Sequence, residues 1–177
     1  MFTPKTDARV LSLTAAAVAL ALSASTGADA ATAQQTINVS AQVNASCSLS
    51  TVALNFGVYD PLVTNATADL TAQTDISVTC TNNASTTISL SSGGQATTGA
   101  SATRQLTDGA ATPHFLTYSL YSDAARGTPW GDGTLAPLLA YTGTGALQPV
   151  TIYGKVDKAQ SATAGSYTDV ITATITF

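Results

Sequence analysis

Apolar and polar residues alternate with a period of two in several short stretches of the chain, which predicts β-strands buried on one face. The alternation is cleanest near residue 40, where Ile37, Val39, Ala41 and Val43 are apolar and the residues between them are polar. Further apolar stretches of this kind cover 54–58, 76–80, 87–90, 115–121, 150–156 and 171–177. Gly, Pro, Asn and Asp separate the stretches, as expected for turns. Six or seven short strands with such turns predict a β-sandwich.

Composition supports an all-β fold and narrows the classes of partner. Of the 177 residues, 45% are hydrophobic and only 9% are charged, so most of the chain is expected to fold. The chain is rich in Ala, Thr, Ser and Gly. Among the helix-favouring residues, Glu is absent and Lys and Met are scarce, which indicates an all-β domain. The net charge is -4 and no basic cluster occurs. These features argue against nucleic acid or an anionic lipid surface as a partner.

Residues 1–30 have the pattern of a secretory signal peptide. Lys5 and Arg9 make the start basic, and an apolar run follows over 10–22. This run is shorter than the roughly 20 residues that span a bilayer, so a permanent anchor is not expected. Ala28-Asp29-Ala30 supplies the small-x-small pattern of a cleavage site. A buried N-terminal helix is the alternative. Cleavage after Ala30 would leave a one-domain exported chain.

Export suggests a role for the two cysteines. Cys47 and Cys80 are the only cysteines and lie 33 residues apart. In an oxidising compartment such a pair most simply forms one disulfide, worth roughly 2–4 kcal/mol. Two free buried thiols are the alternative.

Several of the alternating stretches also carry a family resemblance. The segments are Ile37-Asn38-Val39-Ser40-Ala41-Gln42-Val43 before Cys47, Leu54-Asn55-Phe56-Gly57-Val58-Tyr59-Asp60-Pro61, Ile76-Ser77-Val78-Thr79-Cys80, Tyr118-Ser119-Leu120-Tyr121, and the closing stretch from Gly165 to Phe177. Together they resemble the spore coat protein U domain family, which includes pilin subunits of archaic (Csu-type) chaperone–usher fimbriae. The resemblance covers about residues 34–177.

The resemblance implies an incomplete immunoglobulin-like β-sandwich that is completed by a donated strand. In such fimbriae a periplasmic chaperone lends a strand first, and the N-terminal segment of the next subunit later replaces it. The implied partners are therefore copies of the chain or related subunits, a periplasmic chaperone and an outer-membrane usher. No cofactor is implied.

The same resemblance assigns roles to both ends of the mature chain. It implies that residues 31–45, called the N-terminal segment below, hold a donor strand over 34–45, and that residues 46–177 form the pilin-like domain. The side chains expected to insert are Ile37, Val39, Ala41 and Val43. The expected acceptor groove and chaperone contact comprise Ile171, Ala173, Ile175 and Phe177, with the terminal carboxylate available to the chaperone. Completion of its own domain by the N-terminal segment is the alternative.

Residues that could carry chemistry are few, and we expect no enzyme and no metal site. His114 has no nucleophile motif near it, and it is expected in a loop or at a strand edge. Asp123, Asp132 and Asp157 could bind a cation weakly, but they do not have the spacing of a calcium loop. Trp130 is the residue that a carbohydrate-binding module would use, although a buried or loop-anchoring role is commoner.

The expected function is that of an exported structural subunit of a surface fimbria, assembled by donor-strand exchange and supporting adhesion and biofilm formation. Such a protein passes through the periplasm to the cell surface. The alternatives are a self-complemented secreted spore-coat-like or stress protein and, as a different class, a carbohydrate-binding module.

Overall fold

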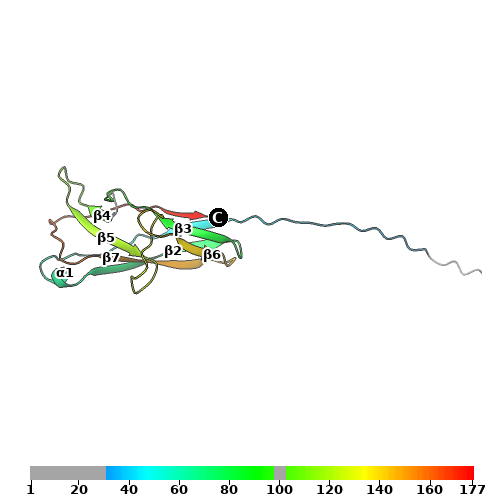
Figure 1. Ribbon diagram of the computed structural model, residues 1–177, viewed down its shortest axis with the longest axis horizontal. Helices are drawn as coiled ribbons and strands as arrows, with labels where there is room; N and C mark the ends of the chain where they lie inside the picture. Colours follow the sequence, from blue (N-terminus) through cyan, green and yellow to red (C-terminus); the bar gives the residue numbers. More distant parts are fainter. Residues whose placement is uncertain (1–30, 98–102) are drawn as a thin grey trace, which may run out of the picture. The chain divides into compact units, whose positions relative to one another are not determined.

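The computed structural model describes residues 31–97 and 103–177, and its body consists of two antiparallel sheets (Figure 1). The larger sheet has the strand order β1-β2-β7-β5-β4 and the smaller one β6-β3-β8. The elements are β1 (Cys47–Thr51), α1 (Thr64–Thr67), β2 (Leu70–Cys80), β3 (Ser85–Leu90), β4 (Arg104–Thr107), β5 (Phe115–Tyr121), β6 (Leu139–Thr142), β7 (Gln148–Val156) and β8 (Ala173–Thr176). The predicted all-β sandwich is confirmed. The predicted signal peptide lies outside the described residues.

The core lies between the sheets and is built by the alternating apolar residues of the longer strands. Along β5 and over residues 76–80 of β2 every second residue is buried, as the period of two requires. The buried apolar side chains are Ile76, Val78, Cys80, Ile88, Leu90, Leu116, Tyr118, Leu120, Trp130, Ile152 and Val156. Each large side chain of this set contributes roughly 1.5–3 kcal/mol through burial, before the cost of ordering the chain.

The antiparallel pair β2–β7 defines two ends of the body. Its register runs from Leu70↔Val156 to Val78↔Gln148. The helix α1 precedes Leu70, so we call the region of residues 57–67 the α1 end. Cys80 closes β2 and pairs with Cys47, and we call this region, with the turns 81–84 and 143–147, the disulfide end. The C-terminus also lies at the disulfide end (Figure 1), since Thr176 of β8 pairs with Thr87 near the start of β3.

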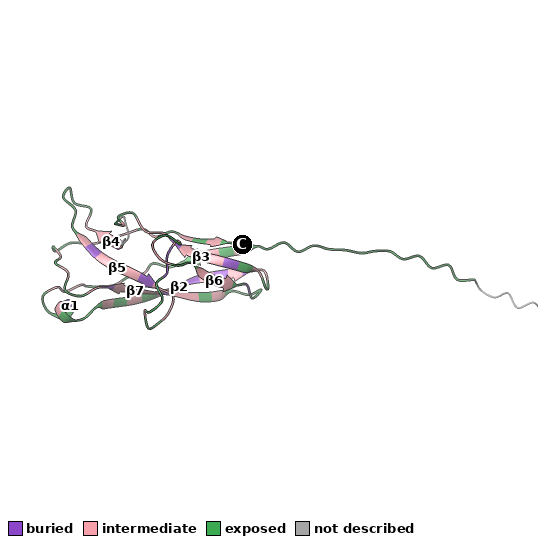
Figure 2. Cartoon of the chain, viewed as in Figure 1, coloured by how far each residue is buried: buried purple, intermediate pink, exposed green. Residues whose placement is uncertain are grey.

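Residues 31–46 form no strand, and their side chains are exposed (Figure 2). Ile37, Val39 and Val43 are 84%, 91% and 82% exposed, so the half-buried strand predicted over 37–43 is not formed within one chain. A strand needs a neighbouring backbone as its hydrogen-bonding partner, and residues 31–46 have no strand pairing in the structure.

Residues 54–58 are also not a strand, contrary to the prediction. Gly57 has a φ of +80°, and the Asn55 side chain accepts a hydrogen bond from the backbone N–H of Gly57 at 2.8 Å, which bends the chain. Leu54 and Phe56 still pack against the core from this irregular segment. The alternation therefore predicted a half-buried segment correctly, but not its pairing.

Candidate strand-binding groove

A long apolar groove lies along the side of the sandwich where the two sheets end. Within the described residues, β1 is the edge of the larger sheet and β8 is the edge of the smaller one. Two cavities of about 750 and 430 Å³ occupy the space beside these edges. They are continuous, because Leu54, Phe56, Leu106 and Asp169 line both.

The walls of the groove come from two irregular segments, and its floor comes from the core. One wall is the chain over 51–62, and the other is the chain over 162–173. The floor side chains are Leu70, Ile76, Leu90, Leu116, Tyr118, Leu120, Ile152 and Val156. The groove thus reaches down to the core, although all of these floor side chains except the half-buried Leu70 are at most 8% exposed.

The groove narrows toward the disulfide end and opens toward the α1 end. β1 and β8 contact each other near the disulfide end. The smaller cavity reaches Thr51 and Ala173, and neither cavity is lined by residues 47–50 or 174–177. The larger cavity extends instead to Leu62 at the α1 end.

A polar cluster sits where the two cavities meet. The Tyr118 hydroxyl donates a hydrogen bond to the Asp169 carboxylate at 2.6 Å, and the backbone N–H of Gly94 donates to the same carboxylate at 2.8 Å. Burial, together with the bond to Asp169, raises the pKa of Tyr118 far above its usual value, so it stays a neutral donor. This cluster fixes the chain just before β8.

A buried arginine supports the same region from behind. Arg104 is 3% exposed and donates hydrogen bonds to three backbone carbonyls, those of Leu90, Ser91 and Trp130, at 2.9–3.1 Å. Burial lowers the pKa of its guanidinium. These bonds hold the end of β3 against β4. They thereby also fix the position of Leu90, which lines the groove.

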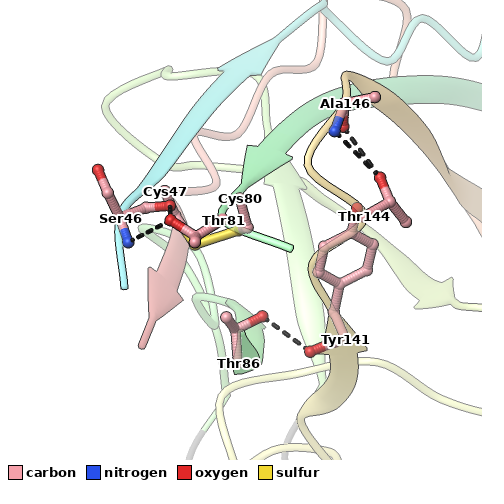
Figure 3. The surroundings of a disulfide bond; sticks show 8 residues. All are labelled: Ser46, Cys47, Cys80, Thr81, Thr86, Tyr141, Thr144 and Ala146. Atoms are coloured by element: carbon pink, nitrogen blue, oxygen red, sulfur yellow. Dashed lines mark hydrogen bonds between the residues drawn. A yellow bond between two sulfur atoms is a disulfide. The ribbon is translucent and has the colours of Figure 1, made fainter. Parts of the chain in front are cut away.

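The disulfide predicted between Cys47 and Cys80 is formed, and it fixes the start of β1 on β2 (Figure 3). The backbone N–H of Ser46 donates to the Thr81 hydroxyl at 3.1 Å, and the Thr81 N–H donates to the Ser46 carbonyl at 2.9 Å. The chain is therefore held firmly from residue 46 onward, at the point where the exposed N-terminal segment ends.

The predicted acceptor residues lie at different depths. Ile171 and Ala173 line the smaller cavity, and Ile175 packs half-buried against the core. Phe177 is 56% exposed and lines neither cavity. The predicted donor side chains Ile37, Val39, Ala41 and Val43 are exposed.

Sequence reasoning did not assign the opposite wall of the groove, which includes Leu54 and Phe56. Their alternating pattern was the available signal, and it was interpreted as a strand. The Phe56 ring meets the Tyr118 ring edge-on, with centroids 6.0 Å apart.

The candidates for other chemistry have structural roles. Trp130 is 1% exposed, and its indole N–H donates to the Ile88 carbonyl at 2.8 Å, so no indole face is available to a sugar. His114 lies 2.7 Å from Asp108 in the β4–β5 turn, and its hydrogen bond lowers the pKa of Asp108. Asp123 and Asp132 accept backbone N–H bonds within turns, which lowers the pKa of each.

The described part of the chain contains neither a cluster of metal ligands nor a membrane-spanning helix. No group of three or more His, Cys, Asp or Glu side chains is placed to hold a metal ion in residues 31–97 and 103–177. In the same ranges, no helix has the length and apolar character needed to cross a membrane.

Comparison with solved structures supports the fold. One chain of the crystal structure of the CsuC–CsuE chaperone–tip adhesion subunit pre-assembly complex, from archaic chaperone–usher Csu pili of Acinetobacter baumannii, matches with a TM-score of 0.50 and 20% identity. The match covers 76% of the present chain and 40% of the solved chain, so the present chain corresponds to less than half of that protein.

Comparison of sequences identifies the family. Protein U of Myxococcus xanthus is 38% identical over 177 residues, covering 95% of this chain and 96% of that protein. The family model of the Spore Coat Protein U domain matches residues 33–174. The chain therefore belongs to the spore coat protein U domain family.

Proposed function

We propose that the protein is an exported structural subunit of a surface fimbria, in which the N-terminal segment of one copy fills the groove of the next. The observation that carries the proposal is the open apolar groove between residues 51–62 and 162–173, in a chain that also has an exposed apolar strand sequence. An open edge with an apolar slot favours pairing with another strand. Strand addition of this kind is an established mode of protein recognition.

The dimensions of the segment and the groove agree. Residues 34–45 and the wall over 51–62 are each twelve residues long. An extended strand of this length spans about 40 Å at roughly 3.3 Å per residue. The segment can therefore run along the whole groove.

The chemistry also agrees. The N-terminal segment has no charged residue, and the groove is lined mainly by apolar side chains. Ile37, Val39 and Val43 could each gain roughly 1.5–3 kcal/mol by burial, before the cost of ordering the segment. Their backbone would supply hydrogen-bonding partners for the edges of β1 and β8.

The partners in this proposal follow from the same groove. Before assembly an open apolar groove needs a temporary cover, which a periplasmic chaperone would provide, and an outer-membrane usher would then exchange it for the next subunit. The solved relative is itself described as a chaperone–subunit complex. The assembled fimbria would act at the cell surface in adhesion and biofilm formation.

Deletion of residues 31–45 tests this function, with assembly measured as heat-sensitive ladders on unheated gels. The deletion should abolish the ladder when the variant is produced alone. Mixed with the intact chain, the variant should shorten the ladder, because it can accept a strand but cannot donate one.

An unchanged ladder after the deletion would show that the segment is not the donor. A self-complemented protein, the second candidate, would instead run as a monomer with or without its chaperone, and the intact chain would show no ladder.

A further inference from the structure

Three exposed apolar side chains gather at the α1 end of the body. Val58, Leu62 and Val63 are 86%, 86% and 71% exposed, and we call them the α1-end patch. Val58 and Leu62 also line the wide mouth of the groove, so the patch continues from it. Single exposed apolar residues are ordinary, but a cluster at the mouth of an apolar groove indicates a contact surface.

The segment that carries the patch is held in place. The Asp60 carboxylate accepts hydrogen bonds from the backbone N–H groups of Leu62 and Val63 at 3.0 and 3.1 Å. The buried Asn65 side chain accepts from the Asp60 N–H and donates to the Ala68 carbonyl. The apolar side chains are therefore presented outward by a fixed loop.

The shape of the groove decides which way a donated strand lies. Its narrow end, where β1 and β8 meet, can hold the free tip of a strand but gives no exit to a following domain. The wide end at Leu62 does give such an exit. On the proposed function, residue 45 of the donating copy therefore leaves the groove at the α1 end, beside the patch.

The tether between the donated strand and its own body is very short. Only Ser46 separates the N-terminal segment from Cys47, and Ser46 is already bonded to Thr81. The disulfide end of the donating copy must therefore lie against the α1 end of the accepting copy. That surface contains the turns 81–84 and 143–147, which carry no charged residue, and Leu147, which is 64% exposed.

We propose that the α1-end patch is a second contact surface between successive copies, which packs on the disulfide end of the copy whose N-terminal segment fills the groove. This inference rests on the proposed function and adds to it a body-to-body contact. The occupant is a second copy of this chain, because the short tether brings an uncharged surface with an exposed leucine to the patch.

Cross-linking tests the contact directly. Leu62→Cys and Leu147→Cys are combined in one chain, and purified assemblies are treated with a short bifunctional maleimide. Within one copy the two positions lie at opposite ends of β2, about 35 Å apart for eleven residues at roughly 3.3 Å each. A product therefore joins two copies. The native cysteines are in the disulfide and do not react.

The control pairs Leu147→Cys with Ala125→Cys, an exposed position in the turn after β5, next to Arg126, whose side chain donates to the Gly154 carbonyl of β7. The contact predicts a ladder of cross-linked copies for the 62–147 pair and no ladder for the 125–147 pair. Equal products from both pairs, or none from 62–147 in assemblies that still depend on residues 31–45, would overturn the contact and leave the donor strand intact. If the patch contacts only a chaperone, the 62–147 pair gives no cross-linked product in these assemblies.

A charge variant measures the strength of the contact. Val63→Asp changes the patch without changing a residue that lines the groove. It should leave the ladder able to form but make its rungs dissociate roughly tenfold faster in denaturant, because the contact between bodies is weakened. Ala125→Asp is the matched control and should dissociate as the unmodified chain does. An unchanged rate in the patch variant would contradict the contact. Ladders that do not depend on residues 31–45 would overturn the proposed function as well.

Discussion

Two stretches far apart in the chain have the same hydrophobic pattern but different structures. Ile37 to Val43 and Ile171 to Phe177 both alternate apolar and polar residues. The first stretch lies in no strand and is almost fully exposed, whereas Ala173–Thr176 forms β8 and its apolar residues are half-buried. The difference lies in the partner that each stretch finds within the chain.

β8 finds its partner in β3, with Ile175 opposite Ile88 and Ala173 opposite Leu90. Thr168, just upstream, forms a backbone bridge with Thr107 of the larger sheet. The chain that leads into β8 is therefore attached to the larger sheet, and β8 itself is attached to the smaller one. The N-terminal stretch has no such pairing. Alternation thus defines which face of a strand is apolar, and the partner must come from elsewhere in the chain or from another molecule.

The largest expected effect tests whether the N-terminal stretch uses one face. Val39→Asp should reduce assembly by roughly a hundredfold or more, because a carboxylate would enter an apolar groove without a partner. Asn38→Asp adds the same charge one residue away, on the other face, and should have little effect. Densitometry of unheated gels measures both. Equal losses in the two variants would show that the stretch is not inserted with alternating faces.

A second test concerns the point where the exposed segment joins the body. Replacing both Cys47 and Cys80 with Ser should lower the free energy of unfolding by about 2–4 kcal/mol, because the closed loop of the unfolded chain is released. Urea unfolding of the variant, compared with the unmodified chain with its disulfide intact, measures this loss, and the reduced unmodified chain should unfold as the variant does. Proteolysis of residues 31–45 should not change, since the segment is already exposed. Faster proteolysis of residues 31–45 in the variant would show that the disulfide protects the segment, which contradicts its independence from the body.

The smallest effect tests the start of the C-terminal stretch. Gly93 has a φ of +87°, and a Cβ placed there would collide with the Asp169 carboxylate. Gly93→Ala should therefore cost about 1–3 kcal/mol more than backbone strain alone, because the carboxylate has to move. Gly109→Ala is the matched control, since its φ is +67° and no atom lies near its Cβ position. Its cost of about 1 kcal/mol reports strain only. Equal losses of stability in the two variants would mean that Asp169 adapts freely.

The sequence was sufficient for the longer strands that pair inside the chain. The stretches 115–121 and 150–156 coincide with β5 and nearly with β7, because both are buried on one face by the core. β1, with five residues, was not predicted. β4 and β6 were also not predicted. Each has only four residues, and β4 begins with Arg104, whose charge indicates an exposed position although its side chain is buried against carbonyl groups.

The groove was predictable only in part. The apolar residues of its C-terminal wall stood out because they alternate, and the family resemblance gave them a role. The facing wall, residues 51–62, could not be told apart from a strand. The bend at Gly57 prevents this segment from pairing with another strand, but it leaves the alternation of Leu54 and Phe56 unchanged. The narrow and wide ends depend on how closely β1 approaches β8, and that distance between segments far apart in sequence leaves no local pattern.

The position of the disulfide has a mechanical consequence. Tension applied to residues 31–45 reaches the body at Cys47, and there the covalent bond passes it directly to Cys80 on β2, the strand that lies between β1 and β7. The hydrogen bonds of the edge strand β1 are therefore not the first to carry the load. A filament pulled along its length would be held at each subunit by a bond that does not unzip.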